Sequence, residues 1–230
     1  MTLYVGLHDR SGSGESVAVA SASVPVPPSP EWQVVNFPLL VPSANMTCVG
    51  STEGADPTIS CGAFGENPGH ACIKCGGEFV IGLAAPGSAH IGYVYAAPGP
   101  WGRLGDLPVL KLTTDAMVAM GVSVIRQGGT VSRTFRWKDW RGSPWLRPSM
   151  GHVWHSALVG SWGLFEFLDM TAAMNVKPIV TLAQDLNTAA DWGDLVEYLF
   201  GDDSTAWGRV RVVNDSHPTP YIIDTFELGK

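Results

Sequence analysis

The chain has 230 residues, which is enough for one large domain or two modest ones. Its formal net charge is −7 with only 14 lysine and arginine residues, so the composition argues against a nucleic-acid-binding surface. No apolar run is long enough to span a bilayer, and the first residues alternate like a strand instead of forming a secretory signal. We therefore expect neither nucleic acid nor membrane as a partner.

The first hundred residues predict an antiparallel β-sandwich. Short runs of apolar residues, many of them alternating with polar ones, are separated by Gly, Ser and Pro clusters, the pattern of strands joined by turns. The expected strands are 3–7, 16–24, 32–40, 78–84 and 90–96. The first strand begins almost at residue 1, so we expect the sandwich to be incomplete at its N-terminus. Trp32 and Trp101 could stack on a sugar ring, but an isolated tryptophan on a strand more often belongs to the core.

Four cysteines, Cys48, Cys61, Cys72 and Cys75, lie within one stretch rich in Gly and Pro. Cys72 and Cys75 have the C-x-x-C spacing of a zinc ligand pair, but no second such pair follows and only His70 is a further candidate nearby. Two disulfides are the stronger prediction, and they imply an extracellular or secretory-pathway location. Four cysteines allow three pairings, and the sequence does not choose among them.

After Pro108 the period of the apolar residues changes from two to about 3.6. Helices and strands are then expected to alternate, at 112–120, 121–126, 163–175, 178–182, 188–199 and 221–228. Thr113 or Thr114 could cap the first helix, and Thr188 with Asp191 forms a capping box for the third. A strand–helix alternation predicts a parallel sheet.

Arg126 ends the first strand of this series. The β-branched residues before it suit a strand buried on both faces, and Gly128 and Gly129 turn the chain directly after it. Parallel α/β folds build ligand sites at the carboxyl ends of their strands, so Arg126 could bind a ligand. A structural ion pair with a carboxylate is the commoner role for an arginine at a strand end.

A series of short motifs runs in a fixed order between residues 119 and 229. They are Arg126…Gly128-Gly129, Phe135-Arg136-Trp137-Lys138, Arg147-Pro148, Val153-Trp154, the segments 163–167 and 207–211, His217-Pro218 and the segment 226–229. In order and spacing they resemble the α-L-arabinofuranosidase family of retaining glycoside hydrolases. The resemblance implies a (β/α)8 barrel and, in eukaryotic-type members, a β-sandwich inserted after the first barrel strand.

On this resemblance we expect an α/β protein with a partial (β/α)8 barrel preceded by the antiparallel β-sandwich. Residues 1–105 would form the sandwich, and residues 106–230 the N-terminal part of the barrel, about three βα units that stop after the fourth strand. A barrel takes about 250 residues on its own. We therefore expect the chain to be a fragment of a longer enzyme.

The resemblance also implies which residues bind substrate. Arg126 matches the family's substrate-site arginine, although only Gln127 separates it from the glycines, where the family usually has an aromatic residue and Pro. Thr130 stands where the family often has an asparagine that contacts the sugar, and Trp154 belongs to the Val-Trp motif. We expect these three residues to bind an arabinose-containing polysaccharide or oligosaccharide, and we expect no cofactor and no metal ion.

Retaining hydrolysis takes two carboxylates, a general acid/base and a nucleophile. In the family the acid/base is the glutamate of a Gly-Asn-Glu motif that ends the fourth strand. Here the strand reads Phe-Glu-Leu-Gly-Lys, so Lys230 has the asparagine position and neither carboxylate stands in its family position. We expect no catalytic residue in this chain. We interpret Glu227 as a structural residue below the barrel mouth, buried against an inward arginine or solvated at an open edge.

Two other functions stay open at this point. The tryptophan-rich segments could belong to a non-catalytic carbohydrate-binding or interaction protein, and the barrel could belong to another enzyme family. His155 and His217 are interpreted as solvated or structural, because no metal or nucleophile signature accompanies either of them. The sequence does not give the oligomeric state.

Overall fold

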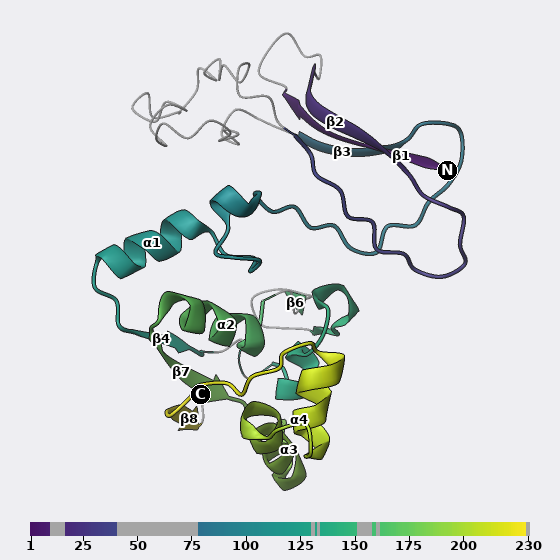
Figure 1. The fold of residues 1–230 in the computed structure, drawn as a ribbon. Coiled ribbons are helices and arrows are strands. Elements are labelled where there is room, and N and C mark those ends of the chain that lie inside the picture. The colour runs from purple at the N-terminus through teal and green to yellow at the C-terminus, as the bar shows by residue number, and fades with distance from the viewer. Residues whose placement is uncertain are drawn as a thin grey trace. The chain divides into compact units, whose positions relative to one another are not determined.

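The structure is a computed structural model of the chain. It describes residues 1–9, 17–40, 78–129, 132, 134–150, 158–159 and 162–228. Cys48, Cys61, Cys72, Cys75, Thr130, Trp154 and His155 lie outside the described residues. The described residues form a mixed α/β protein with small sheets and four α-helices, divided into two units, Met1–His90 and Ile91–Lys230 (Figure 1). Among them, no helix is both long and apolar enough to cross a membrane.

The first unit contains a three-stranded antiparallel sheet with the order β2-β1-β3. Its strands are β1 (Thr2–Asp9), β2 (Val17–Pro25) and β3 (Glu78–Leu83). The central strand β1 pairs on both sides, and Val5 lies opposite Ala22 on one neighbour and Ile81 on the other. These three strands confirm the sequence prediction for their segments.

The strands expected over 32–40 and 90–96 are wrong, because both segments are irregular. Neither segment pairs with the outer edge of β2 or of β3, so neither joins the hydrogen-bonded ladder of the sheet. The apolar residues of these segments also do not mark a buried face, since Trp32 is 74% exposed and Tyr95 is 55% exposed. Trp101, in the short 3-10 helix Pro100–Gly102, is 54% exposed, so the core interpretation of Trp32 and Trp101 is wrong as well.

The second unit is built on a three-stranded parallel sheet with the order β4-β7-β8. Its strands are β4 (Val124–Gln127), β7 (Lys177–Leu182) and β8 (Phe226–Leu228). Helix α1 (Lys111–Ala119) precedes β4, α2 (Leu164–Met174) connects β4 to β7, and α3 (Ala189–Phe200) and α4 (Ala206–Arg209) connect β7 to β8. The predicted strand–helix alternation and parallel sheet are confirmed, although β8 starts later than expected.

The long connection from β4 to α2 and the return from α4 to β8 contain shorter elements. They are the 3-10 helices Trp137–Trp140 and Pro144–Leu146, the hairpin strands β5 (Ser149–Met150) and β6 (Leu158–Val159), and the π-helix Val210–Asn214. None of these elements was predicted from the sequence.

Strand β4 is not buried on both faces, as its apolar composition predicted. It lies at one side of the sheet with a single partner among the described strands, and Val124 is 46% exposed. Strand β7 is the central strand, and Val180 and Thr181 on its two faces are both fully buried. The difference in burial between β4 and β7 follows from the order of the strands in the sheet, which the sequence pattern does not predict.

Helices α2 and α3 share a core with one face of the sheet. Leu164, Phe167, Leu168 and Thr171 of α2 are all buried, as the periodicity predicted. In α3, Leu195 and Leu199 are buried but Val196 is 59% exposed, so that part of the predicted face is wrong. The core also holds an aromatic cluster of Trp137, Phe165, Tyr198 and Tyr221, in which neighbouring ring centroids are 4.9 to 6.5 Å apart.

The helix starts show one correct and one incorrect capping prediction. The Thr188 hydroxyl accepts a hydrogen bond from the Asp191 backbone N–H at 3.2 Å, and the Asp191 carboxylate accepts one from the Thr188 backbone N–H at 2.9 Å. This capping box is confirmed. Helix α1 instead begins at Lys111 after Leu110, so Thr114 lies inside its first turn and donates to the Lys111 carbonyl.

Candidate functional site

Three polar side chains lie at the carboxyl ends of the parallel strands. Arg126, Thr181 and Glu227 are each the penultimate residue of their strands, β4, β7 and β8. Side chains alternate between the two faces of a sheet. Ile125, Val180 and Leu182 point to the helical core, so the three polar residues share the opposite face. Strand pairing places Thr181 directly opposite Glu227.

The three side chains form one hydrogen-bonded group centred on the carboxylate of Glu227. Arg126 donates from both Nε and Nη2 to the two carboxylate oxygens, and the Nη2 bond is 2.9 Å long. The Thr181 hydroxyl donates to Oε2 of the same carboxylate at 2.8 Å. The arginine–carboxylate contact is thus bidentate, the geometry that fixes the plane of a guanidinium group. We call Arg126, Thr181 and Glu227 the strand-end group.

Gly128 makes room for this group. A Cβ atom at Gly128 would lie 2.3 Å from the Thr181 hydroxyl oxygen and 3.0 Å from the guanidinium carbon of Arg126. Any residue with a side chain at this position would therefore displace the buried Thr181 hydroxyl or Arg126. A glycine at position 128 is thus required for the Arg126 and Thr181 side chains to reach Glu227, in addition to turning the chain after β4.

The electrostatics of the group favour its charged form. The hydrogen bonds from Arg126 and then from Thr181 hold the pKa of Glu227 below its usual range, and the bond to Glu227 raises the pKa of Arg126. A general acid at neutral pH needs a raised carboxyl pKa. Glu227 therefore has the wrong electrostatic environment for proton donation to a leaving group.

The structure tests several expectations about these residues. Arg126 lies beside the tip of the last strand, as predicted, and Glu227 pairs with an arginine, as predicted; the two strands concerned, β8 and β4, lie on either side of β7. Glu227 is not deeply buried, because its side chain is 39% exposed and that of Arg126 is 45% exposed. Thr181 was missed, although it is the only hydroxyl-bearing residue in the apolar run of β7 and this was an available signal.

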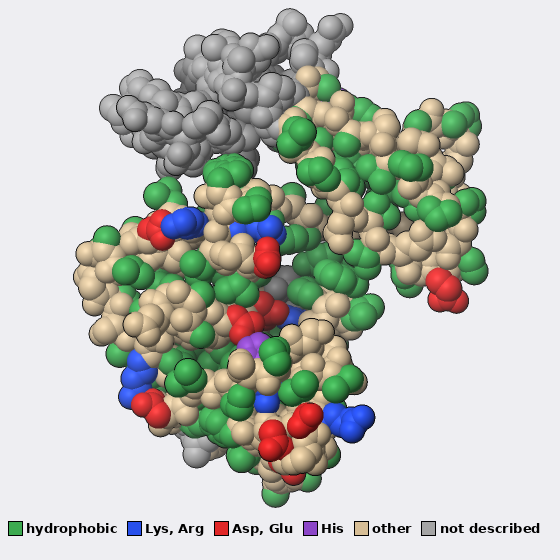
Figure 2. All heavy atoms as spheres, viewed as in Figure 1, with side chains coloured by type: hydrophobic (Ala, Val, Ile, Leu, Met, Phe, Trp, Pro, Cys, Tyr) green, Lys and Arg blue, Asp and Glu red, His purple; other side chains and the backbone are tan. Residues whose placement is uncertain are grey.

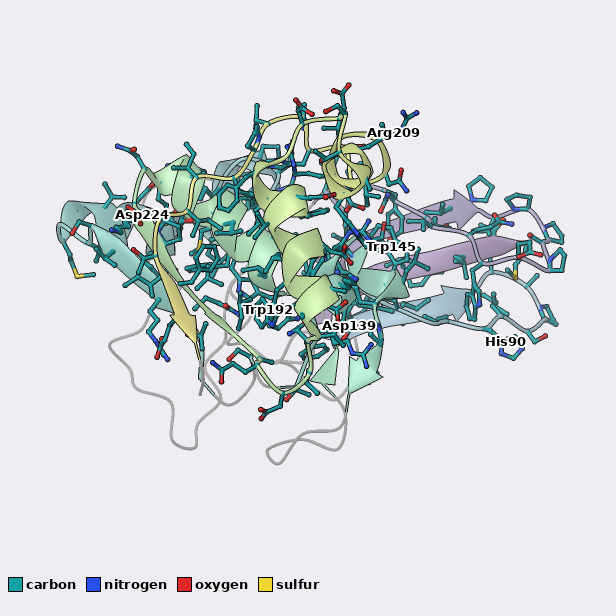
Figure 3. All side chains as sticks on the ribbon, turned by 90° about the horizontal axis from the view of Figure 1, so that it is seen from below. His90, Asp139, Trp145, Trp192, Arg209 and Asp224 are labelled. Atoms are coloured by element: carbon teal, nitrogen blue, oxygen red, sulfur yellow. The ribbon has the colours of Figure 1, made fainter. Side chains whose placement is uncertain are left out.

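A second polar cluster joins the loop after β4 to helix α3. The Lys138 ammonium group lies 2.6 Å from the Asp191 carboxylate and 2.5 Å from that of Asp194, and 4.6 Å from the ring centre of Trp207. Trp137 donates its indole N–H to the Asp191 backbone carbonyl at 2.8 Å. Figure 3 shows Asp139 of the loop and Trp192 of α3 near the N-terminal end of α3. The Arg-Trp-Lys motif therefore anchors the loop.

Two further arginines, Arg141 and the motif residue Arg147, also have structural contacts. Arg141 donates to the Asp215 carboxylate at 2.8 Å, and the Tyr198 hydroxyl donates to the same carboxylate at 2.7 Å. Burial and the neighbouring Asp215 carboxylate raise the pKa of Tyr198, which keeps its hydroxyl protonated. Arg147 forms a buried bidentate ion pair with Glu166 of α2.

His217 has a structural environment, which supports its interpretation from the sequence. Its Nε2 lies 3.2 Å from the Asp169 carboxylate, and its ring stacks on Tyr221 with a centroid distance of 4.1 Å. The buried Arg211 donates to its backbone carbonyl at 2.9 Å. Across the part of the chain that the structure describes, no group of three or more His, Cys, Asp or Glu side chains could hold a metal ion.

The sequence from residue 116 to residue 230, half of the chain, matches the family described as the α-L-arabinofuranosidase 1 domain. The chain belongs to this family. No protein of curated function matches the sequence. The matched region contains all three residues of the strand-end group and every residue of the polar cluster around Lys138.

Solved α-L-arabinofuranosidase structures share the fold. An arabinose-bound MgGH51 α-L-arabinofuranosidase is 15% identical and covers 100% of this chain and 35% of its own, with a TM-score of 0.61. The arabinose complex of the Thermotoga maritima α-L-arabinofuranosidase is 22% identical and covers 61% of this chain and 29% of its own, with a TM-score of 0.51. The chain thus spans about a third of the length of these relatives.

Proposed function

We propose that the strand-end group forms part of a binding site for a terminal arabinofuranosyl unit of a polysaccharide or oligosaccharide. The observation that carries the proposal is the position of Arg126, which is exposed at the carboxyl end of a parallel strand and held there by Glu227. Parallel α/β folds bind ligands at this edge of the sheet. Family membership, together with the arabinose present in two solved relatives, supports arabinose as the sugar. Thr130 and Trp154 are proposed to contribute further contacts.

The same proposal covers the architecture. The β4-β7-β8 sheet, with its connecting helices, is the arrangement of successive units of a (β/α)8 barrel. We propose that residues 106–230 form part of such a barrel and residues 1–105 part of a β-sandwich, within a longer protein that works outside the cell or in the secretory pathway.

We further propose that these 230 residues do not hydrolyse the glycosidic bond by themselves. Lys230 has the asparagine position of the family's Gly-Asn-Glu motif, and the ion pair with Arg126 keeps Glu227 ionised. A retaining mechanism needs one carboxyl group that can give up a proton to the leaving group and a second that acts as nucleophile. In this chain the strand-end group would bind and orient the sugar.

The test combines a binding measurement with an activity measurement on the 230-residue protein. Titration of the 15N-labelled protein with methyl α-L-arabinofuranoside should shift the amide signals of Gly128, Thr181 and Glu227. Arg126→Ala should weaken binding about tenfold or more, because hydrogen bonds from a charged donor are lost. Lys111→Ala is the control, since Lys111 lies outside the strand-end group and pairs with the exposed Asp115 on α1.

A chromogenic arabinofuranoside should not be turned over above background. Turnover by the pure protein that one Asp or Glu substitution abolishes would contradict the non-catalytic assignment. Arabinan binding that survives Arg126→Ala would move the binding function from the strand-end group to another place, such as the exposed Trp32 of the first unit or, separately, the exposed Trp101 of the second.

A further inference from the structure

We propose that Glu227 is a positioning residue that fixes the orientation of the Arg126 guanidinium. By neutralising the charge of this guanidinium, Glu227 also makes the site bind neutral sugars in preference to sugar acids. The part of this inference that concerns sugar rests on the proposed function. It assigns to Glu227 a role other than acid/base catalysis, and it predicts a specificity that can be measured separately.

The positioning role follows from three contacts that meet at one carboxylate. Arg126 bonds through two nitrogen atoms to both oxygens of Glu227, so the guanidinium cannot rotate about its own axis without breaking a bond. Thr181, which is fully buried, holds the carboxylate itself at 2.8 Å. Thr181 on the central strand β7 therefore fixes the Glu227 carboxylate of β8. The carboxylate in turn fixes Arg126 of β4, on the other side of β7.

The specificity follows from the charges at the same place. The guanidinium and the carboxylate together carry no net charge, so a neutral polyhydroxy ligand gains hydrogen bonds without an electrostatic penalty. A sugar carboxylate would meet an arginine that is already paired and would lie near a second carboxylate of the same sign. The ion pair of Lys177 with Asp224 lies at the opposite strand ends, because Lys177 begins β7 and Asp224 precedes β8.

Removal of the Glu227 charge should reverse this selectivity. In Glu227→Gln the amide cannot neutralise Arg126, so the site acquires a net positive charge and a less ordered guanidinium. We expect D-galacturonate to bind at least about fivefold more tightly to this variant than to the wild type, and we expect this gain to decrease as salt is added. Methyl α-L-arabinofuranoside should bind about tenfold more weakly, because its hydrogen-bond donor is no longer held in one orientation.

The matched control is Asp115→Asn. It removes one negative charge from the chain, as Glu227→Gln does, but from an exposed i,i+4 pair on α1. Galacturonate binding that is the same in Glu227→Gln and Asp115→Asn would overturn the specificity role. A general effect of net charge would change both variants equally.

A second measurement needs no ligand and no variant that alters charge. The Nε–H of Arg126 should give a slowly exchanging NMR signal in the wild-type protein, and Thr181→Val, which removes one anchor of the carboxylate, should broaden or shift it. A fast-exchanging Arg126 signal in the wild type would overturn the positioning role, even if Glu227→Gln failed to fold.

The outcomes separate this inference from the proposed function. A wild type that binds no arabinofuranoside, together with a gain of galacturonate binding in Glu227→Gln, would refute the arabinose site and support the role of Glu227. A wild type that binds arabinofuranoside, together with a Glu227→Gln variant that behaves as Asp115→Asn does, would refute the role of Glu227 and leave the arabinose site in place.

Discussion

Replacement of Gly128 by alanine should destabilise the second unit, although the change adds only one methyl group at an exposed turn. The new Cβ would lie 2.3 Å from the Thr181 hydroxyl oxygen and 2.8 Å from the Thr181 Cβ, which is about 1.1 Å and about 0.6 Å closer than the ordinary contact distance of 3.4 Å. Thr181 cannot move away easily, because it is fully buried on the central strand of the sheet. The turn after β4 must shift instead, and Arg126 shifts with it.

The cost can be worked out from known overpacking energies. Addition of a methyl group to a well-packed site costs about 1–3 kcal/mol. For a unit of about 140 residues, each kcal/mol lowers the melting temperature by about 2–4 °C. A central value of about 2 kcal/mol therefore predicts a decrease of roughly 4–8 °C, which thermal unfolding followed by tryptophan fluorescence would measure.

Gly193→Ala is the matched control for this substitution. Gly193 lies within α3, and a Cβ atom there would meet nothing within 4 Å. Alanine is favoured over glycine inside a helix by about 1 kcal/mol, so this variant should melt at a higher temperature than the wild type. If Gly128→Ala melted at or above the wild-type temperature, the reasoning about the strand-end group would be refuted.

Two further predictions concern α3 and its surroundings. Leu199→Ala, at a buried core position, should lower the free energy of unfolding by about 2–5 kcal/mol. Val196→Ala, at an exposed position one turn away, should change it by less than about 0.5 kcal/mol. Urea titration of both variants measures the two changes. The Lys138 ammonium and then the Thr188 backbone N–H hold the pKa of Asp191 well below its usual range. The Asp191 carboxylate therefore stabilises the fold fully at a pH above its unfolded pKa of about 3.9. This contribution is lost as the pH falls through the lowered pKa of the folded protein. Asp191→Asn should therefore be less stable than the wild type at pH 7, and the difference in urea midpoint should shrink below about pH 4; a difference that stays constant down to pH 2 would contradict the assignment.

The sequence predicted the elements of the second unit well because most of them carry their own pattern. The face of α2 and the capping box of α3 are local signals, and both are confirmed by buried leucines and by the Thr188–Asp191 contacts. The position of Arg126 beside the last strand was also predictable, since the ends of parallel strands meet at one edge of a sheet.

The wrong predictions have a common physical cause. A local sequence pattern does not determine which distant segments will pack against it. Strand β4 has the composition of a buried strand, but its place at the side of the sheet leaves Val124 exposed. Segments 32–40 and 90–96 contain strand-forming residues but do not pair with either outer strand of the first sheet. Thr181 was missed for the same reason, because its importance depends on Glu227, which is 46 residues away.

Exposed apolar side chains mark surfaces that the described residues do not cover. Figure 2 shows many hydrophobic side chains at the surface. Among the exposed hydrophobic residues, Leu110, Leu112, Val118 and Met120 lie on or beside α1, and each is more than half exposed. Such a surface favours association between molecules. Purification at low protein concentration should therefore give a better-behaved sample for the measurements described above.

The distance along the chain between Arg126 and Glu227 has a consequence for the order of folding. The two residues are 101 positions apart, so their contact requires α2, β7 and α3 to be in place between them. Contacts of large sequence separation are slow to form, because the chain entropy of closing the loop is lost before the contact compensates for it. We therefore expect refolding to restore the helical signal first and the slowly exchanging Nε–H of Arg126 last, which makes the ion pair a reporter of completed folding.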